Sequence, residues 1–276
     1  MVKKTDYTAE KVEAARRVII ELMHLLKHYY NDIAVIGGWV PDLAISKKAT
    51  PYVGSMDVDL AINHKCIDDA GYRNIEELLG GAGYRQGKQP FIYIRKVKTG
   101  EQEIEVQVDL LSGVYSGTSE SHRHQQAAGF KARKVRGCDI VFDVPAEEKE
   151  IEGILPDGGL DSVSVRIASA VPFIVMKAFA LDERIKQKDA WDIYYYLSNY
   201  PGGIDTIIAE FKSYLKNKLV EEGLQKLKKH FASIDHAGPR FITDFEGISD
   251  QEELERIRRD AFEKVNYLLR NSGFGK

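Results

Sequence analysis

The eight residues SMDVDLAI, numbers 55–62, alternate between acidic or polar and aliphatic side chains, with Asp57 and Asp59 two positions apart. A period of two is typical of a β-strand, in which successive side chains point to opposite faces of a sheet. The two carboxylates therefore share one face of a strand, where like charges repel unless cations neutralise them. This stretch restricts the chain to folds that contain a sheet, and it makes the purpose of the paired acids the first question.

The residues before this strand predict a helix, a second strand and a turn. Apolar side chains recur every three or four positions over residues 8–30, which predicts an amphipathic helix with Thr8 as its N-cap. The run IAVI at 33–36 predicts a short strand, and Gly37 and Gly38 predict a tight turn into a short helix.

The residues after it predict more sheet. Residues 67–79 are expected to be helical, and FIYIRKV and EIEVQVDLL form an antiparallel hairpin around KTGEQ. CDIVFDV and DSVSVRIA are expected to be further short strands, whereas residues 112–137, rich in glycine, serine, histidine and basic residues, are expected to be a loop.

The remainder of the chain has a helical pattern. VPFIVMKAFALDERIKQKDAWDIYYYLSNY predicts two helices, and a last helix begins near Asp250, where Glu253 would complete a capping box. The expected fold is α/β (α+β), with a mixed sheet and flanking helices followed by a C-terminal helical region. The expected domains are residues 1–168, which include the N-terminal helix, and residues 169–276.

Composition narrows the function classes. The 276 residues carry a formal net charge of −3, so no overall basic excess points to nucleic acid. The two cysteines match no metal-ligand spacing. The charged N-terminus has no apolar signal core, and no apolar run is as long as a membrane span. We expect a cytoplasmic protein without a membrane partner.

Three acids are expected to converge. Asp109 lies on the strand EIEVQVDLL, and if this strand neighbours the one carrying Asp57 and Asp59, all three carboxylates meet. Hard divalent cations with oxygen ligands, above all Mg²⁺, suit such a cluster. Two metal ions held in this way stabilise the attacking and leaving oxygens of phosphoryl transfer. A glycine turn beside a helix N-terminus offers backbone N–H groups to a phosphate.

This arrangement resembles the nucleotidyltransferase fold of the DNA polymerase beta superfamily. The matching segments are VIGGWV, SMDVDLAI and VQVDLL, and the later segment MKAFALDERIKQKDAWDIYYYL makes the chain most similar to the abortive-infection (AbiEii-like) nucleotidyltransferase toxin family. Ser55 stands where that family often has Thr, and Gly38 stands where many relatives have Ser.

The resemblance implies a metal-dependent enzyme that moves a nucleoside monophosphate from a nucleoside triphosphate to an acceptor. The acceptor would be RNA, such as tRNA, or protein, and an antitoxin would be a partner. Asp57, Asp59 and Asp109 would be catalytic and hold two Mg²⁺ ions, or Mn²⁺ in their place. The nucleotide would be bound by Gly37, Gly38, Ser55 and Lys177.

Other interpretations compete with this one. The chain could instead modify a small molecule, such as an antibiotic hydroxyl, or bind nucleotide without catalysis. The paired acids could be a solvated strand edge, and Lys177 a structural partner of an acid. The sequence leaves open whether Lys188 and Asp189 form a structural pair and whether the loop residues His122, Arg123 and His124 face a substrate. The basic residues at 131–136 and 212–229 could be solvated or could steer RNA.

Overall fold

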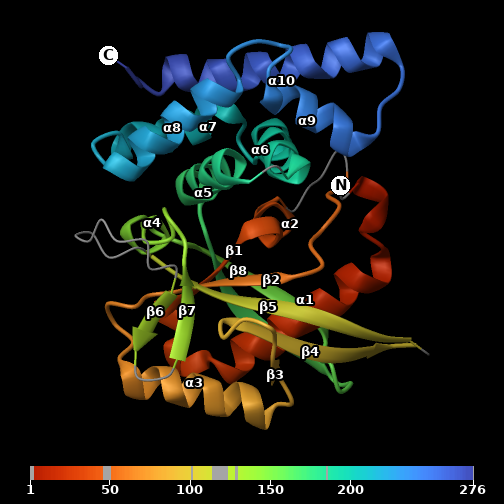
Figure 1. Cartoon of the computed structure of the whole chain (residues 1–276), viewed down its shortest axis with the longest axis vertical. Coiled ribbons are helices and arrows are strands. Elements are labelled where there is room, and N and C mark those ends of the chain that lie inside the picture. Colours follow the sequence, from red (N-terminus) through yellow and green to blue (C-terminus); the bar gives the residue numbers. More distant parts are fainter. Residues whose placement is uncertain are drawn as a thin grey trace. The chain divides into compact units, whose positions relative to one another are not determined.

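The structure is a computed structural model that describes residues 3–45, 51–100, 102–113, 124–127, 130–184 and 186–275 (Figure 1). The chain divides into two compact units. The sheet unit comprises Tyr7–Val40 and Gly54–Ser169, and the helical unit comprises Met1–Asp6, Pro41–Val53 and Ala170–Lys276. The main boundary between the units follows Ser169. The short segment Pro41–Val53 is assigned to the same unit as the C-terminal helices.

The sheet unit is built on one mixed sheet, which confirms the predicted fold class. Its strands run in the order β3-β4-β5-β2-β1-β9-β8, and β6 and β7 form a hairpin that joins the sheet where β7 pairs with β5. The pairs β2–β5, β1–β9 and β5–β7 are parallel and the others antiparallel. The bounds are β1 Ile33–Ile36, β2 Val58–Ile62, β3 Arg85–Gln86, β4 Ile92–Thr99, β5 Gln102–Ser112, β6 His124–Ala127, β7 Phe130–Lys134, β8 Glu147–Ile154 and β9 Leu160–Ile167.

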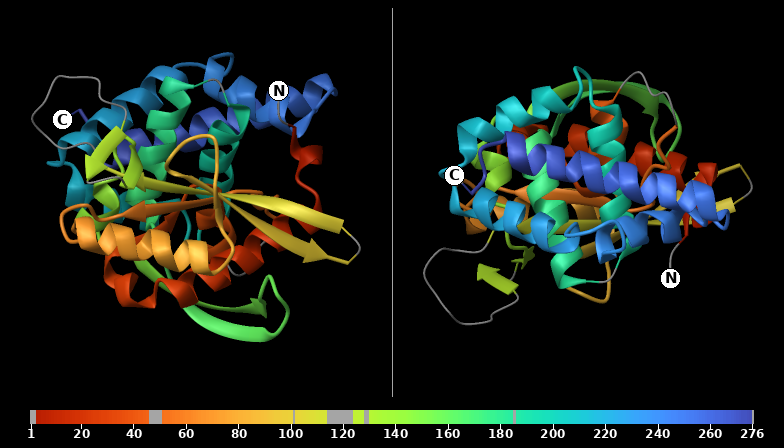
Figure 2. Two further views of the ribbon diagram at one scale, coloured as in Figure 1. Left: turned by 60° about the horizontal axis from the view of Figure 1, so that its bottom comes forward. Right: turned by 90° about the horizontal axis from the view of Figure 1, so that it is seen from above.

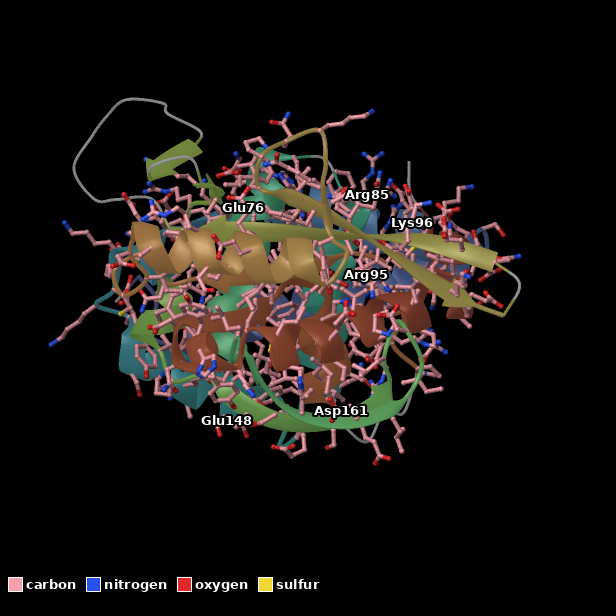
Figure 3. All side chains as sticks on the ribbon, turned by 90° about the horizontal axis from the view of Figure 1, so that it is seen from below. Glu76, Arg85, Arg95, Lys96, Glu148 and Asp161 are labelled. Carbon is pink, nitrogen blue, oxygen red and sulfur yellow. The ribbon has the colours of Figure 1, made fainter. Side chains whose placement is uncertain are left out.

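Helices α1 (Ala9–Leu25) and α3 (Asp69–Gly81) cover one face of this sheet (Figures 1 and 2). Arg95 of β4 marks that face, because its guanidinium donates to both carboxylate oxygens of Glu21 on α1, at 3.0 and 2.9 Å (Figure 3). Arg95 is in register with Val106 of β5. Side chains alternate along a strand, so Val106, Val108 and Leu110 face α1, and Gln107 and Asp109 point to the opposite face.

The N-terminal ends of the helices follow the sequence closely. Thr8 occupies the N-cap position of α1, although its side chain makes no capping hydrogen bond. The predicted helix over 8–30 is shorter than expected, because α1 gives way to the 3-10 turn η2 (Lys27–Asp32) before β1. Asp68 caps α3 by accepting from the Gly71 N–H at 2.8 Å.

Three predictions about the middle of the chain were wrong. CDIVFDV contains the one-turn helix α4 (Ile140–Asp143) in place of a strand, because a short apolar run fits either structure. Residues 112–137 contain the β6–β7 hairpin in place of a pure loop. Strand β8 was missed, because its outward positions carry Glu148, Glu150 and Glu152 and leave little apolar alternation.

The helical unit contains the two helices predicted over residues 171–200. They are α5 (Ala170–Glu183) and α6 (Gln187–Asn199), followed by α7 (Ile204–Tyr214), α8 (Lys218–His230), α9 (Ala237–Glu246) and α10 (Gln251–Asn271). Helix α5 packs on α6 and α8, and α9 packs on α6 and α10. Asp250 caps α10 as expected, accepting from the Glu253 N–H at 2.8 Å. Across the described ranges, each helix is too short or too polar to cross a membrane.

Candidate functional site

Two of the three predicted acids lie side by side in the sheet. Strands β2 and β5 are parallel, and Asp59 is in register with Asp109. Neighbouring strands lie about 4.8 Å apart, and residues in register point to the same face, so both carboxylates project from the face that α1 does not cover. Their strand neighbours Val58, Leu60, Val108 and Leu110 are fully buried on the α1 side. The alternation in the sequence thus gives the sheet a buried apolar face toward α1 and an acidic face on the opposite side.

Asp57 lies one residue before β2, and two neighbours hold it there. The Ser55 hydroxyl donates to Asp57 Oδ1 at 3.3 Å, and the indole N–H of Trp39 donates to the Asp57 carbonyl oxygen at 2.9 Å. Ser55 and Trp39 are both buried, with 6% and 1% of their surface exposed. Trp39 ends the glycine turn, so it ties the turn after β1 to the backbone entering β2. Nothing in the sequence marks Trp39 as part of the site.

The glycine turn lies directly against the Asp59 carboxylate. Gly37 and Gly38 open the 3-10 turn η3 (Gly37–Trp39), which leads into the short helix α2 (Val40–Ala44). Gly37 has a φ of 69°, a backbone conformation that residues with a Cβ rarely adopt. A Cβ on Gly37 would lie 2.2 Å from Asp59 Oδ2. The missing side chain is therefore what lets the turn close against this carboxylate.

Gln107 is a site residue that the sequence analysis missed. It precedes Asp109 by two positions on β5, and its amide Nε2 donates to Asp109 Oδ1 at 2.8 Å. An amide between two valines carries no chemical signal of its own in the sequence. Only the same-face spacing of residues two apart could have singled it out.

The donor set suits a hard divalent cation in kind. Asp59 and Asp109 supply carboxylate oxygens on one face, and hard divalent cations prefer oxygen ligands of this kind. Within the described residues, no group of three or more His, Cys, Asp or Glu side chains is arranged to hold a metal ion. The metal role of Asp57, Asp59 and Asp109 therefore stays a prediction.

Lys177 lies in the helical unit, where the structure gives it two carboxylate partners. Its ammonium is 2.9 Å from Asp189 Oδ1 and 2.6 Å from Asp192 Oδ2. Both contacts are ion pairs, and the one with Asp189 is also a hydrogen bond. Burial by itself would lower the pKa of Lys177, but the two carboxylates outweigh it and raise this pKa above its usual value. A role of Lys177 in nucleotide binding remains a prediction.

Lys188 and Asp189 also belong to this buried cluster. Arg184 donates to both Asp189 oxygens, at 3.0 and 3.2 Å, while the Lys188 ammonium contacts Asp192 Oδ1 at 2.8 Å. Burial would raise the pKa of Asp189, but Lys177 and Arg184 together lower it below its usual value. His122 and Arg123 lie outside the described residues, and His124 begins strand β6.

The comparisons with known proteins identify the family. The profile of the family described as "Nucleotidyl transferase AbiEii toxin, Type IV TA system" matches residues 45–265. The chain belongs to the AbiEii family. This match covers both halves of the chain and includes Ser55, the three acids and Lys177, whereas Gly37 and Gly38 precede it. As an AbiEii member the protein is a nucleotidyltransferase of a Type IV toxin–antitoxin system.

Comparisons with solved structures and with curated proteins add little to this assignment. One solved structure, described as "Solution Structure of Antibiotic-Resistance Factor ANT(2'')-Ia Reveals Substrate-Regulated Conformation Dynamics", matches with a TM-score of 0.34 and 12% identity. The match covers 80% of this chain and 95% of that one. No curated protein matches the chain.

Proposed function

We propose that this AbiEii protein transfers a nucleoside monophosphate from a nucleoside triphosphate to an acceptor hydroxyl, and that the acidic face of β2 and β5 is its catalytic site. The observation that carries the proposal is the register of Asp59 with Asp109, with the Gly37 backbone directly against Asp59. The glycine turn offers backbone N–H groups to a charged triphosphate, and the aligned acids offer a group that can accept a proton.

Each residue would have its own task. The backbone N–H groups of Gly37 and Gly38 and the hydroxyl of Ser55 would bind the triphosphate. Asp109 would orient the acceptor hydroxyl and take its proton as that oxygen attacks the α-phosphorus in line. The bond between the α-phosphorus and the bridging oxygen then breaks, and pyrophosphate leaves. Gln107 would keep Asp109 turned toward the acceptor.

The acids would also hold divalent cations. Mg²⁺, or Mn²⁺, bound by Asp57, Asp59 and Asp109 would neutralise the triphosphate charge. Asp57 is held by Ser55 and Asp109 by Gln107, so these carboxylates need little reorganisation before reaction.

The acceptor and the partner belong to the proposal as well. We propose RNA, such as tRNA, or protein as the acceptor. The reaction would take place in the cytoplasm, and modification of the acceptor would inhibit cell growth. An antitoxin encoded as the second component of the system would counter this inhibition.

The direct test incubates the purified chain with each α-³²P-labelled nucleoside triphosphate, MgCl₂, total RNA and a cell extract. Labelled RNA or labelled protein supports the proposal and identifies the acceptor class. A labelled small molecule would replace that acceptor with an antibiotic-type one. The matched variant is Asp59→Asn, which keeps the shape of the side chain and removes its charge. Transfer at the wild-type rate by folded Asp59→Asn would contradict the proposal.

A further inference from the structure

Of the three predicted metal ligands, Asp57 is the one whose backbone lies outside the strand pairing of the sheet. The register of β2 with β1 begins at Asp59 and Ile36, and its register with β5 begins at Val58 and Val108. In the described part of the chain neither pairing reaches Asp57, which lies in a bend one residue before β2. Asp59 is held by strands on both sides, whereas the backbone of Asp57 needs a different anchor.

The Trp39 side chain supplies this anchor. Its indole N–H donates to the Asp57 carbonyl oxygen at 2.9 Å. An indole nitrogen is only a donor, and inside a protein it normally requires an acceptor. A backbone carbonyl just beyond the end of a strand provides one. This single bond therefore does for the Asp57 backbone what the strand pairing does for Asp59.

The glycine turn sets the position of Trp39. Trp39 is the third residue of η3, and the Val40 N–H closes this turn by donating to the Gly37 carbonyl oxygen. A Cβ on Gly37 would lie 2.2 Å from Asp59 Oδ2, so the turn also lies against that carboxylate. One short turn thus contacts Asp59 through Gly37 and Asp57 through Trp39. All of these residues belong to the sheet unit, and the arrangement is complete within it.

The Asp57 side chain has its own, weaker contact. The Ser55 hydroxyl donates to Asp57 Oδ1 at 3.3 Å, which is longer than the distance of about 2.7–2.8 Å that is usual between a hydroxyl donor and an oxygen. The indole bond to the Asp57 carbonyl, at 2.9 Å, has the usual length for an N–H donor. Ser55 therefore orients the carboxylate, and Trp39 is the main determinant of where the residue itself lies.

We propose that Trp39 is a positioning residue for nucleotide transfer, and that it acts by holding the Asp57 backbone through the indole N–H. Without this bond the carboxylate moves with a stretch of chain outside the strand pairing, and a misplacement of about 1 Å in an active site lowers the rate by about a hundredfold. Trp39 contacts no substrate in this role. The inference rests on the proposed function, because it assigns Trp39 to the same reaction.

The variant Trp39→Phe tests the proposal, because it keeps an aromatic ring and removes the indole N–H. The matched control is Trp191→Phe at the only other tryptophan of the chain, which is also buried and whose indole donates to Glu246 within the helical unit. Each variant loses one buried indole and one hydrogen bond. With labelled nucleoside triphosphate and the acceptor found above, we expect kcat of Trp39→Phe to fall by about tenfold to a hundredfold, and kcat of Trp191→Phe to stay within about threefold of wild type.

Hydrogen exchange followed by mass spectrometry gives a readout that does not depend on catalysis. It is measured on the purified chain without nucleotide or metal. In Trp39→Phe, peptides that cover residues 55–58 should exchange about fivefold faster than in wild type, the factor expected from losing one hydrogen bond of average strength. Peptides that cover Asp109 should be unchanged, and Trp191→Phe should exchange as wild type over residues 55–58. A merely destabilising substitution would raise exchange throughout the sheet.

The outcomes separate this inference from the proposed function. Inactive Asp59→Asn together with wild-type kcat in Trp39→Phe would overturn the role of Trp39 alone, whatever the exchange rates. Equal losses of activity in Trp39→Phe and Trp191→Phe, in step with their melting temperatures, would also overturn it. Full activity in Asp59→Asn would overturn the proposed catalytic site itself. If Trp39→Phe does not fold, 3-benzothienylalanine at position 39 keeps the size of the indole and removes only the N–H, and wild-type kcat in that protein would equally overturn the inference.

Discussion

At the scale of single residues, Gly37 is under two separate constraints. Its positive φ disfavours any residue with a Cβ by roughly 1 kcal/mol, and a Cβ would also lie 2.2 Å from Asp59 Oδ2. We therefore expect Gly37→Ala to displace the Asp59 carboxylate and to reduce transfer at least about a hundredfold.

Gly100 provides the control for this prediction. It lies in the turn between β4 and β5 with a similar φ of 64°, and nothing lies within 4 Å of the position its Cβ would take. Gly100→Ala should lose a comparable amount of stability and retain activity. Similar activities for the two alanine variants would show that the contact between Gly37 and Asp59 does not affect nucleotide transfer. Melting temperature and initial rate are the two measurements.

Gln107 offers a second prediction at this scale. Gln107→Leu removes the hydrogen bond to Asp109 Oδ1 while keeping a side chain of similar size. Loss of a partner that orients a functional carboxylate typically costs about 10-fold to 100-fold in activity, and we expect kcat to fall within this range. Gln102→Leu, at an exposed position of the same strand, should behave as wild type. A Gln107→Leu enzyme with unchanged kcat would contradict the orienting role.

At the scale of elements, the Lys177 cluster links α5 to α6. Lys177→Met leaves the buried Asp189 and Asp192 carboxylates without one cation, and removing one partner of a buried ion pair typically costs about 3–5 kcal/mol. We expect a clear fall in the free energy of unfolding, measured by urea denaturation. If Lys177 also contacts the triphosphate, the folded variant should bind nucleotide more weakly as well. A stable variant with wild-type nucleotide affinity would rule out both roles.

The elements also show where sequence reasoning succeeds. Strand β1 was predictable as a short continuous apolar run, and β2, β4 and β5 were predictable because their apolar side chains repeat with a period of two. Strand β8 was missed because three of its solvent-facing positions, Glu148, Glu150 and Glu152, are glutamate, and α4 was missed because four residues carry too little periodicity. Such segments take their structure from pairing partners, and a local pattern does not reveal those partners.

The candidate site divides in the same way. The spacing of Asp57 and Asp59 placed both acids near one face, and the alternation of EIEVQVDLL placed Asp109. The register that brings Asp59 beside Asp109 could only be assumed from the sequence, because parallel pairing joins segments about fifty residues apart. Gln107 and Trp39 contribute through single hydrogen bonds from side chains that carry no catalytic signature. Their positions required the folded structure.

At the scale of the whole molecule, the two units do not correspond to two continuous pieces of chain. Composition changes near residue 169, yet Pro41–Val53 belongs to the helical unit. Within that unit, Tyr52 stacks on Trp191 and supplies the hydroxyl that Lys188 contacts. A helical fragment made without residues 41–53 would therefore expose apolar surface and leave the Lys188 ammonium without one of its hydrogen-bond acceptors.

This discontinuity predicts how the chain responds to being cut. Separate expression of residues 1–168 and 169–276 should give fragments that unfold at lower temperature than the full chain or aggregate, because burying the Tyr52 ring and pairing Lys188 require both pieces. Mixing the fragments during refolding should restore a cooperative transition. The matched control adds residues 41–53 to the N-terminus of 169–276 through a flexible linker, which should raise the melting temperature of the helical fragment. A bare 169–276 fragment that melts as high as this fusion would show that Tyr52 and its neighbours contribute nothing to the helical unit.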